Sequence, residues 1–195
     1  METDLIQQVQ QNLDYPPLHK IDPNTEKIKT PEGGDTRPGR FSQATIPATL
    51  TALCMYGESD QGAEAILHAD LSNNWGKVLF ADTKEDISRR IASYAGYSLA
   101  EVNDSINQIA DESIRLIRER VTENGTKTDV QNLLRGIRTE VLTFLPADLR
   151  VGELLNDPAL DDKTHKMEGP VSNLMHKISA IFTGPADKEE NNTSS

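Results

Sequence analysis

The residues of this sequence that could do chemistry are its histidines, its carboxylates and its one cysteine. The densest group is LDDKTHKMEGPVSNLMHKI, residues 160–178, which contains three acidic side chains, two histidines and two methionines. Such side chains bind metal ions or transfer protons when their spacing brings them together. Yet no two of the four histidines have the i, i+4 spacing of a zinc-binding helix. We therefore expect no metal ion and no other cofactor.

Cys54 is the candidate nucleophile. A reactive thiol needs a nearby base and a polar, accessible setting. Cys54 follows Leu53 on the apolar side of a predicted helix, and no polar motif surrounds it. We interpret it as a small buried hydrophobic residue. A single cysteine also excludes an intramolecular disulfide and is typical of a reducing compartment.

Other motifs of catalysis or nucleotide binding are missing from the sequence. It contains neither the G-x-x-x-x-G-K-[ST] nor the G-x-G-x-x-G pattern that cradles phosphates. The adjacent carboxylates of Asp111 and Glu112 would point about 100° apart on a helix, so they do not form a catalytic pair. The sequence therefore predicts no catalytic residue and favours a protein that is not an enzyme.

A formal net charge of −11 argues against nucleic acid and anionic membranes as partners. Both are bound through lysine and arginine side chains. Residues 83–107 have the outline of a helix-turn-helix, but the second helix would present Glu101 and Asp104 to DNA without a lysine or arginine. No run approaches the ~20 apolar residues of a membrane span, and the first residues lack the pattern of a secretory signal. These features favour a cytoplasmic location.

The hydrophobic pattern has a helical period along most of the chain, and no segment alternates as a strand does. The sequence therefore predicts an all-α fold, a multi-helix bundle with an N-terminal amphipathic helix on an arm rich in proline and glycine. We divide it into the N-terminal helix with its extended arm, residues 1–40, the bundle, residues 41–183, and a disordered polar tail, residues 184–195.

The first helix is predicted over residues 3–14, with its apolar side chains on one face. Five prolines and three glycines follow between residues 15 and 40, a composition typical of a linker or extended arm. Leu18 and Ile21 are the arm residues suited to docking on a surface. The apolar face of the first helix consists of Leu5, Ile6, Val9 and Leu13.

Capping residues and apolar stripes predict the helices of the bundle. A helix over residues 41–57 would hold Pro47 in its first turn, where the missing N–H costs little. A short helix around Trp75 is expected to plug the core with Trp75, Val78, Leu79 and Phe80. The next long helices are expected to start at Ser59, at Thr83 with Asp86, at Ser98 with Glu101, and at Thr128, with Gly96 ending the second of them.

The later part of the chain gives two further expectations. Gly136 lies in the middle of the helix that starts at Thr128, and we interpret it as a point of close packing by another helix. Residues 152–169 are predicted to be a polar connector, and residues 170–182 an amphipathic helix with His176 on its solvent side. The opening group of histidines and carboxylates is therefore interpreted as structure, and at most as a contact surface.

Three helix motifs of the sequence share the residue spacing of one known family. The matching positions are Ile46, Pro47, Leu50 and Leu53, then Ser59, Gly62, Ala63 and Leu67, and then Ile91, Ala92, Gly96, Ser98 and Val102. By these positions, residues 42–121 resemble the bacterial YidB-like domain of unknown function. The sequence departs from that family at Asp111, where the family often has proline, and at VLFADTK, where it is rich in glycine and phenylalanine. The resemblance implies helices and a bacterial protein, but no activity.

Two functional hypotheses follow. The first is a non-enzymatic interaction or scaffold module, in which the apolar face of the first helix docks on a partner protein or on a second copy of the chain. The alternative is a small-molecule-binding domain or small enzyme with a pocket between helices. The polar residues nearest the predicted core, and so the candidates for that pocket, are Arg90, Tyr94, Tyr97 and Arg115.

Overall fold

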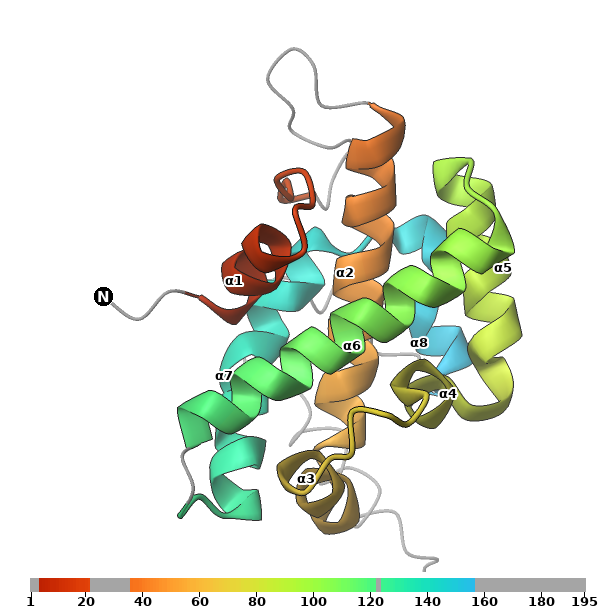
Figure 1. The fold of residues 1–195 in the computed structure, drawn as a ribbon. Coiled ribbons are helices and arrows are strands. Elements are labelled where there is room, and N and C mark those ends of the chain that lie inside the picture. Colours follow the sequence, from red (N-terminus) through yellow and green to blue (C-terminus); the bar gives the residue numbers. More distant parts are fainter. Residues whose placement is uncertain (1–3, 22–35, 122–123, 157–195) are drawn as a thin grey trace, which may run out of the picture.

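The structure is a computed structural model and describes residues 4–21, 36–121 and 124–156. All regular elements in these ranges are helical, which confirms the predicted all-α multi-helix bundle (Figure 1). The 3-10 turns η1 (Ala81–Thr83) and η2 (Ala147–Leu149) connect α4 to α5 and α7 to α8. The α-helices are α1 (Leu5–Asn12), α2 (Arg37–Tyr56), α3 (Asp60–Leu67), α4 (Trp75–Phe80), α5 (Lys84–Ala95), α6 (Leu99–Val121), α7 (Lys127–Phe144) and α8 (Val151–Leu154).

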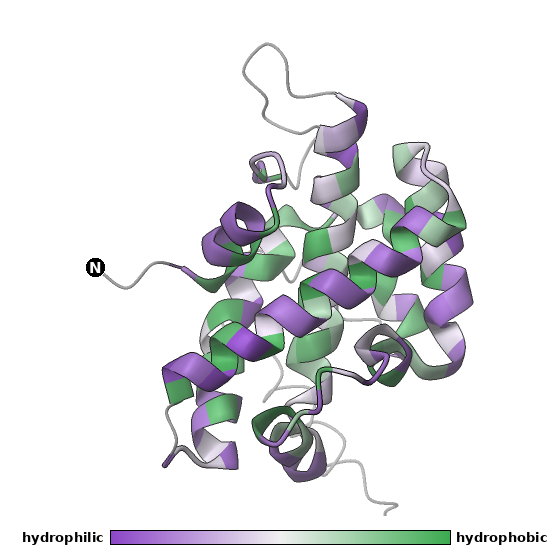
Figure 2. Ribbon diagram, in the orientation of Figure 1, coloured by the Kyte–Doolittle hydropathy of each residue, from purple (hydrophilic) through white to green (hydrophobic). Residues whose placement is uncertain are grey.

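Helix α2 lies at the centre of the bundle. Every residue from 41 to 54 is buried, the polar ones included, because α5, α6 and α7 pack around it (Figure 1). The hydroxyls of Thr45 and Thr49 donate to the carbonyls of Phe41 and Thr45, at 2.7 and 2.8 Å, so they find their partners within the helix. A helix enclosed in this way needs no polar face, whereas α6 alternates hydrophilic and hydrophobic stretches along its length (Figure 2).

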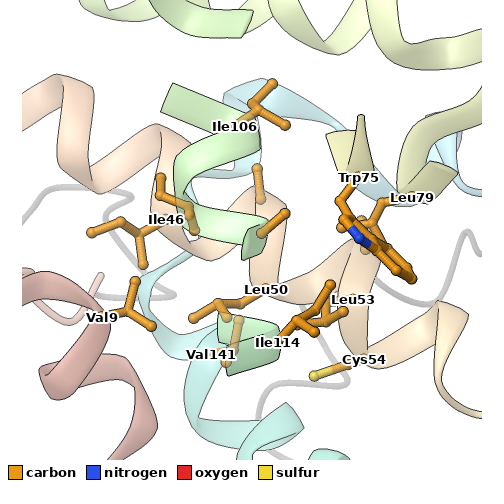
Figure 3. Packing of buried hydrophobic residues seen from close by; sticks show 14 of the residues in the cluster. Val9, Ile46, Leu50, Leu53, Cys54, Trp75, Leu79, Ile106, Ile114 and Val141 are labelled. Atoms are coloured by element: carbon orange, nitrogen blue, oxygen red, sulfur yellow. The ribbon is translucent and has the colours of Figure 1, made fainter. Parts of the chain in front are cut away.

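The core gathers side chains from α1, α2, α4, α6 and α7 (Figure 3). Leu50 and Leu53 of α2 are fully buried there with Ile114 of α6. Trp75 of α4 closes one end, and its indole N–H donates to the Asp70 carbonyl at 3.0 Å, so this buried N–H has a partner. Burying one such leucine or isoleucine side chain contributes about 1.5–3 kcal/mol. The arrangement of helices therefore follows from the burial of one apolar stripe on each.

Several predicted helix ends are confirmed. The Ser59 hydroxyl accepts from the N–H of Gly62 at 2.9 Å and caps α3. The N–H of Ser98 donates to Glu101 Oε2 at 2.8 Å, and the N–H of Glu101 donates to Ser98 Oγ at 3.3 Å, which together make the expected capping box of α6. Gly96 ends α5 in the left-handed conformation, with φ at +73°.

The predicted position of Pro47 in a first turn is wrong. Helix α2 begins at Arg37, because the hydroxyl of Thr36 accepts from the N–H of Gly39 at 3.1 Å and Pro38 occupies the first turn. Pro47 therefore lies well inside the helix. The arm is shorter than the sequence predicted, since the proline that starts the helix was counted as part of the arm.

Two other predicted caps differ from the structure. Thr83 precedes α5 as predicted, but it makes no capping bond, because its hydroxyl donates back to the carbonyl of Phe80 at 2.6 Å. Helix α7 is capped by Thr126 rather than Thr128, since Thr126 has Asp129 three residues on and the pair forms a capping box. Sequence alone does not decide whether Thr126 or Thr128 caps α7. Nor does it decide which backbone group the Thr83 hydroxyl will bind.

Two packing predictions are wrong, since Val78 and Gly136 are exposed, and Leu99 at the start of α6 is exposed as well. Val78 is 39 % exposed, because α4 has only six residues and buries its Trp75 and Leu79 side instead. Leu99 is 43 % exposed, since it is the first residue of α6 and precedes the buried stripe. A Cβ atom placed on Gly136 would meet nothing within 4 Å, so no helix packs closely there.

The described part of the chain ends after α8. Val151 in α8 is buried, and Arg90 of α5 donates to the carbonyls of Leu149 and Arg150, each at 3.1 Å. The start of the predicted polar connector is therefore helical and attached to the bundle. Residues 157–195, which hold both histidines of the opening stretch, the predicted last helix and the polar tail, lie outside the described residues.

Candidate interaction site between α1 and α7

Helix α1 packs on α6 and α2 with its apolar face turned into the core. Leu5, Ile6 and Val9 are at most 2 % exposed, and Leu13 is half-buried against the same core. The face that the sequence assigned to a partner is therefore covered by the chain's own bundle, because a helix with one apolar stripe buries that stripe where a core is available. The side of α1 left for a partner is the polar one.

Polar side chains fix the orientation of α1 on α6. Arg120 Nη2 donates to Gln8 Oε1 at 2.7 Å, and Asn12 Nδ2 donates to Glu112 Oε1 at 2.6 Å. The guanidinium of Arg115 hydrogen-bonds Glu112 and lowers the pKa of that carboxyl, so Glu112 stays ionised and a strong acceptor for Asn12. These contacts determine which residues of α1 face outward.

The arm leaves α1 along the same surface. The hydroxyls of Tyr15 and Ser105 share a hydrogen bond of 2.5 Å, and burial raises the pKa of Tyr15. Leu18, one of the two predicted docking residues, packs against the core. Its N–H donates to Gln10 Oε1 at 3.3 Å, which joins the arm to the outer side of α1.

A single buried amide, that of Gln43 in α2, joins the arm to the end of α7. Its Oε1 accepts from the N–H of His19 at 2.9 Å. Its Nε2 donates to the carbonyl of His19 at 2.9 Å and to that of Phe144 at 2.5 Å. The second predicted docking residue, Ile21, donates its N–H to the carbonyl of Thr143 at 2.9 Å. The arm and the end of α7 are thus held side by side.

A pocket of about 340 Å³ lies between α1, the arm and the end of α7. Pockets that bind organic ligands have volumes of about 300–1,000 Å³, so this one can hold a small molecule or a few side chains of a partner. From α1 it is lined by Asp4, Gln7, Gln10 and Gln11. The remaining lining is apolar apart from one carboxylate, and consists of Ile6, Pro17, Leu18, Glu140 and Phe144.

The charged groups of the pocket lining are both acidic. Asp4 Oδ1 accepts from the N–H of Ile6 at 3.3 Å and caps α1, which leaves the second carboxylate oxygen for other donors. Glu140 is exposed, and no side chain of the described residues pairs with its carboxylate. The ammonium of Lys20 lies 5.9 Å from the ring centroid of Phe144, but Lys20 does not line the pocket.

Sequence reasoning missed this pocket because its residues are far apart in the chain and look like ordinary solvated side chains. The one signal was in α1, LIQQVQQN, whose polar side carries four glutamines and no charged residue. Solvent-facing sides of helices usually carry charges. A row of uncharged amides is therefore an indication of a face that makes contacts.

Cys54, the residue weighed as a candidate nucleophile, lies in the core of the bundle. Cys54 is 2 % exposed, and its Sγ lies 3.6 Å from the carbonyl oxygen of Leu134. Burial raises the pKa of the thiol to about 12, so the reactive thiolate does not form near neutral pH. The interpretation of Cys54 as a buried hydrophobic residue is confirmed.

The polar residues proposed for an alternative pocket make structural contacts elsewhere. Arg115 pairs with Glu112 and Glu119 on its own helix, and Arg90 binds the turn before α8. Tyr97 stacks on Phe41 with 3.9 Å between ring centroids, and Tyr94 is half-buried against the core. The lining of the α1–α7 pocket contains none of the four candidates, Arg90, Tyr94, Tyr97 and Arg115.

Searches of the described residues for a metal site and for a membrane span, and of known proteins for similar ones, gave no match. Within residues 4–21, 36–121 and 124–156, no three His, Cys, Asp or Glu side chains are placed to hold a metal ion. In the same ranges no helix combines the length and apolar character that crossing a membrane requires. No family model, curated protein or solved structure matches the chain, and the resemblance to the YidB-like domain stays a prediction.

Proposed function

We propose that the protein is a non-enzymatic interaction module that binds a segment of a partner protein in the α1–α7 pocket. The observation that carries this proposal is the pocket itself, with a volume of about 340 Å³ and a lining that combines amides with apolar side chains. Amides such as those of Gln7 and Gln11 pair with the N–H and C=O groups of a peptide backbone. Apolar residues such as Phe144 receive a side chain of the bound segment.

The lining suits binding better than reaction. General acid–base or nucleophilic catalysis needs a base held within hydrogen-bond reach of a second reactive group. Among the described residues, the pocket lining includes no histidine, cysteine, serine or lysine, and one of its two carboxylates, Asp4, already accepts a hydrogen bond from the N–H of Ile6. Glutamine amides neither take up nor release protons near neutral pH, so they favour recognition.

The experiment is a selection of displayed random dodecapeptides on the immobilised full-length protein, repeated on two variants. Gln7→Trp places a large ring in the pocket, whereas Gln61→Trp makes the same change at an exposed residue of α3 that does not line it. We expect peptides selected on the unmodified protein to bind Gln61→Trp equally and to lose about tenfold or more in affinity for Gln7→Trp, since a steric block removes the contacts made by a central side chain.

Two results would contradict the proposal. Equal affinity of the selected peptides for both variants would place their binding outside the pocket. The second result has two parts: no peptide is recovered, and a metabolite raises the melting temperature of the unmodified protein but not that of Gln7→Trp. The pocket would then bind a small molecule, which is the alternative function.

A further inference from the structure

The charges of the pocket indicate which segment it takes, and this inference rests on the proposed function. We infer that the bound segment places a lysine or arginine side chain near Asp4 and Glu140, next to an apolar side chain on Leu18 and Phe144. The partner is therefore a protein segment with a cationic residue beside an apolar one.

The first argument is charge complementarity. Within the part of the chain that the structure describes, the carboxylates of Asp4 and Glu140 are the charged side chains of the lining, which includes no lysine, arginine or histidine there. In the described residues neither carboxylate is neutralised by an ion pair. Charges of like sign placed together across an interface cost free energy, so an acidic segment is rejected and a cationic one is attracted.

The second argument comes from the apolar wall. Lys20 holds its ammonium 5.9 Å from the ring centroid of Phe144, a distance at which the negative face of an aromatic ring attracts a cation. The same ring contributes to the pocket lining beside Leu18. The aliphatic stem of a lysine or arginine, or a neighbouring leucine, can cover this wall while the charged end reaches a carboxylate.

The third argument is the arrangement of α1. Asp4, Gln7 and Gln11 follow each other at spacings of three and four, so they lie in a row on one side of the helix. Gln10 is already occupied by the N–H of Leu18. The amides of Gln7 and Gln11 have no side-chain hydrogen bond within the described residues, so they can pair with the backbone of an extended segment that runs along α1. The carboxylate of Asp4, at the start of the row, can then select the side chain of that segment.

The test uses four fluorescein-labelled peptide mixtures and the full-length protein. Each mixture is GXKLXG-amide with fluorescein on its N-terminal amine, or its counterpart with Arg, Gln or Glu in place of Lys, where X is an equimolar mixture of residues. Affinity is measured by fluorescence anisotropy at low and at high salt. Exposed ion pairs contribute about 0.2–1 kcal/mol each, so two carboxylates give the Lys and Arg mixtures about a twofold to thirtyfold advantage over the Gln mixture. Salt should reduce that advantage.

Two variants with the same change in net charge make the test specific. Glu140→Gln removes a carboxylate of the pocket, and Asp82→Asn removes an exposed carboxylate of η1. We expect Glu140→Gln to lower the preference for Lys over Gln by about twofold or more, and Asp82→Asn to leave it unchanged.

The outcomes separate this inference from the proposed function. Equal binding of all four mixtures, or a preference for Glu, would overturn the inference and leave the pocket as a peptide site. Failure of every mixture, combined with failure of the display selection, would overturn both. If n-butylamine binds the unmodified protein as tightly as the Lys mixture, the site takes a small cation and the inferred protein segment is wrong.

Discussion

Gln43 is the residue on which two walls of the pocket depend. Its amide makes three hydrogen bonds to backbone groups of His19 and Phe144. We predict that Gln43→Leu, which keeps the volume and removes the amide, lowers the free energy of unfolding by about 2–3 kcal/mol, because buried backbone groups lose their partners. Urea denaturation of the full chain measures this loss. Gln61→Leu, at an exposed position, should cost less than about 0.5 kcal/mol, and an equal loss for both variants would show that the amide does not hold the walls.

Cys54 makes the stability of the protein depend on pH. Burial raises the pKa of its thiol to about 12, whereas the thiol of an unfolded chain has a pKa of about 8.5. The contribution of the buried neutral thiol is therefore complete below about pH 8.5 and is lost as the pH rises toward 12, since only the unfolded chain releases the proton. We predict that the unmodified protein loses about 1 kcal/mol more than Cys54→Ala between about pH 9 and pH 10, as measured by urea midpoints. Parallel curves for the two proteins would contradict this prediction.

At the scale of single helices, α7 contains a position where a substitution should make the protein more stable. Gly136 is exposed in the middle of the helix, and a Cβ atom there would touch nothing. We predict that Gly136→Ala raises the free energy of unfolding by about 0.5–1 kcal/mol, because alanine loses less backbone entropy than glycine in a helix. Thermal denaturation followed by circular dichroism measures it.

The matched control for that prediction lies in α3. A Cβ atom on Gly62 would come within 1.8 Å of the Tyr56 carbonyl oxygen, so Gly62→Ala should destabilise the protein. If both substitutions destabilise, α7 needs a glycine for a reason other than packing.

The helices also show what the sequence could predict and what it could not. The capping box of Ser98 with Glu101 was predictable because it joins residues three apart. The start of α2 was not, since Pro47 suits a first turn as well as Pro38 does, and only the tertiary burial of the whole helix decides between them. The pocket depends on contacts such as that of Gln43 with Phe144, which are 101 residues apart and follow no local pattern.

At the scale of the whole molecule, α1 shares one hydrophobic core with the helices of the bundle. The sequence predicted that its apolar face was available to a partner, which implies that the bundle folds equally well without it. The burial of Leu5, Ile6 and Val9 leads to a different expectation. Each such side chain contributes about 1.5–3 kcal/mol when buried, so α1 accounts for a substantial part of the total stability of a small protein.

We predict that deleting residues 1–14 lowers the urea midpoint and the melting temperature well below those of the full chain, because the apolar surface of α6 that α1 covers becomes exposed. Removing the polar residues 184–195, a segment of similar length, should change neither. A synthetic peptide of residues 1–21 added to the shortened chain should raise the melting temperature further with each increase in its concentration, since binding to the folded state stabilises it by mass action. The same peptide with Ile6→Asp and Val9→Asp should not, because it cannot bury those charges. If the shortened chain has the same melting temperature as the full-length protein, α1 is not part of the stable core. Its apolar face is then the interaction surface that the sequence first indicated.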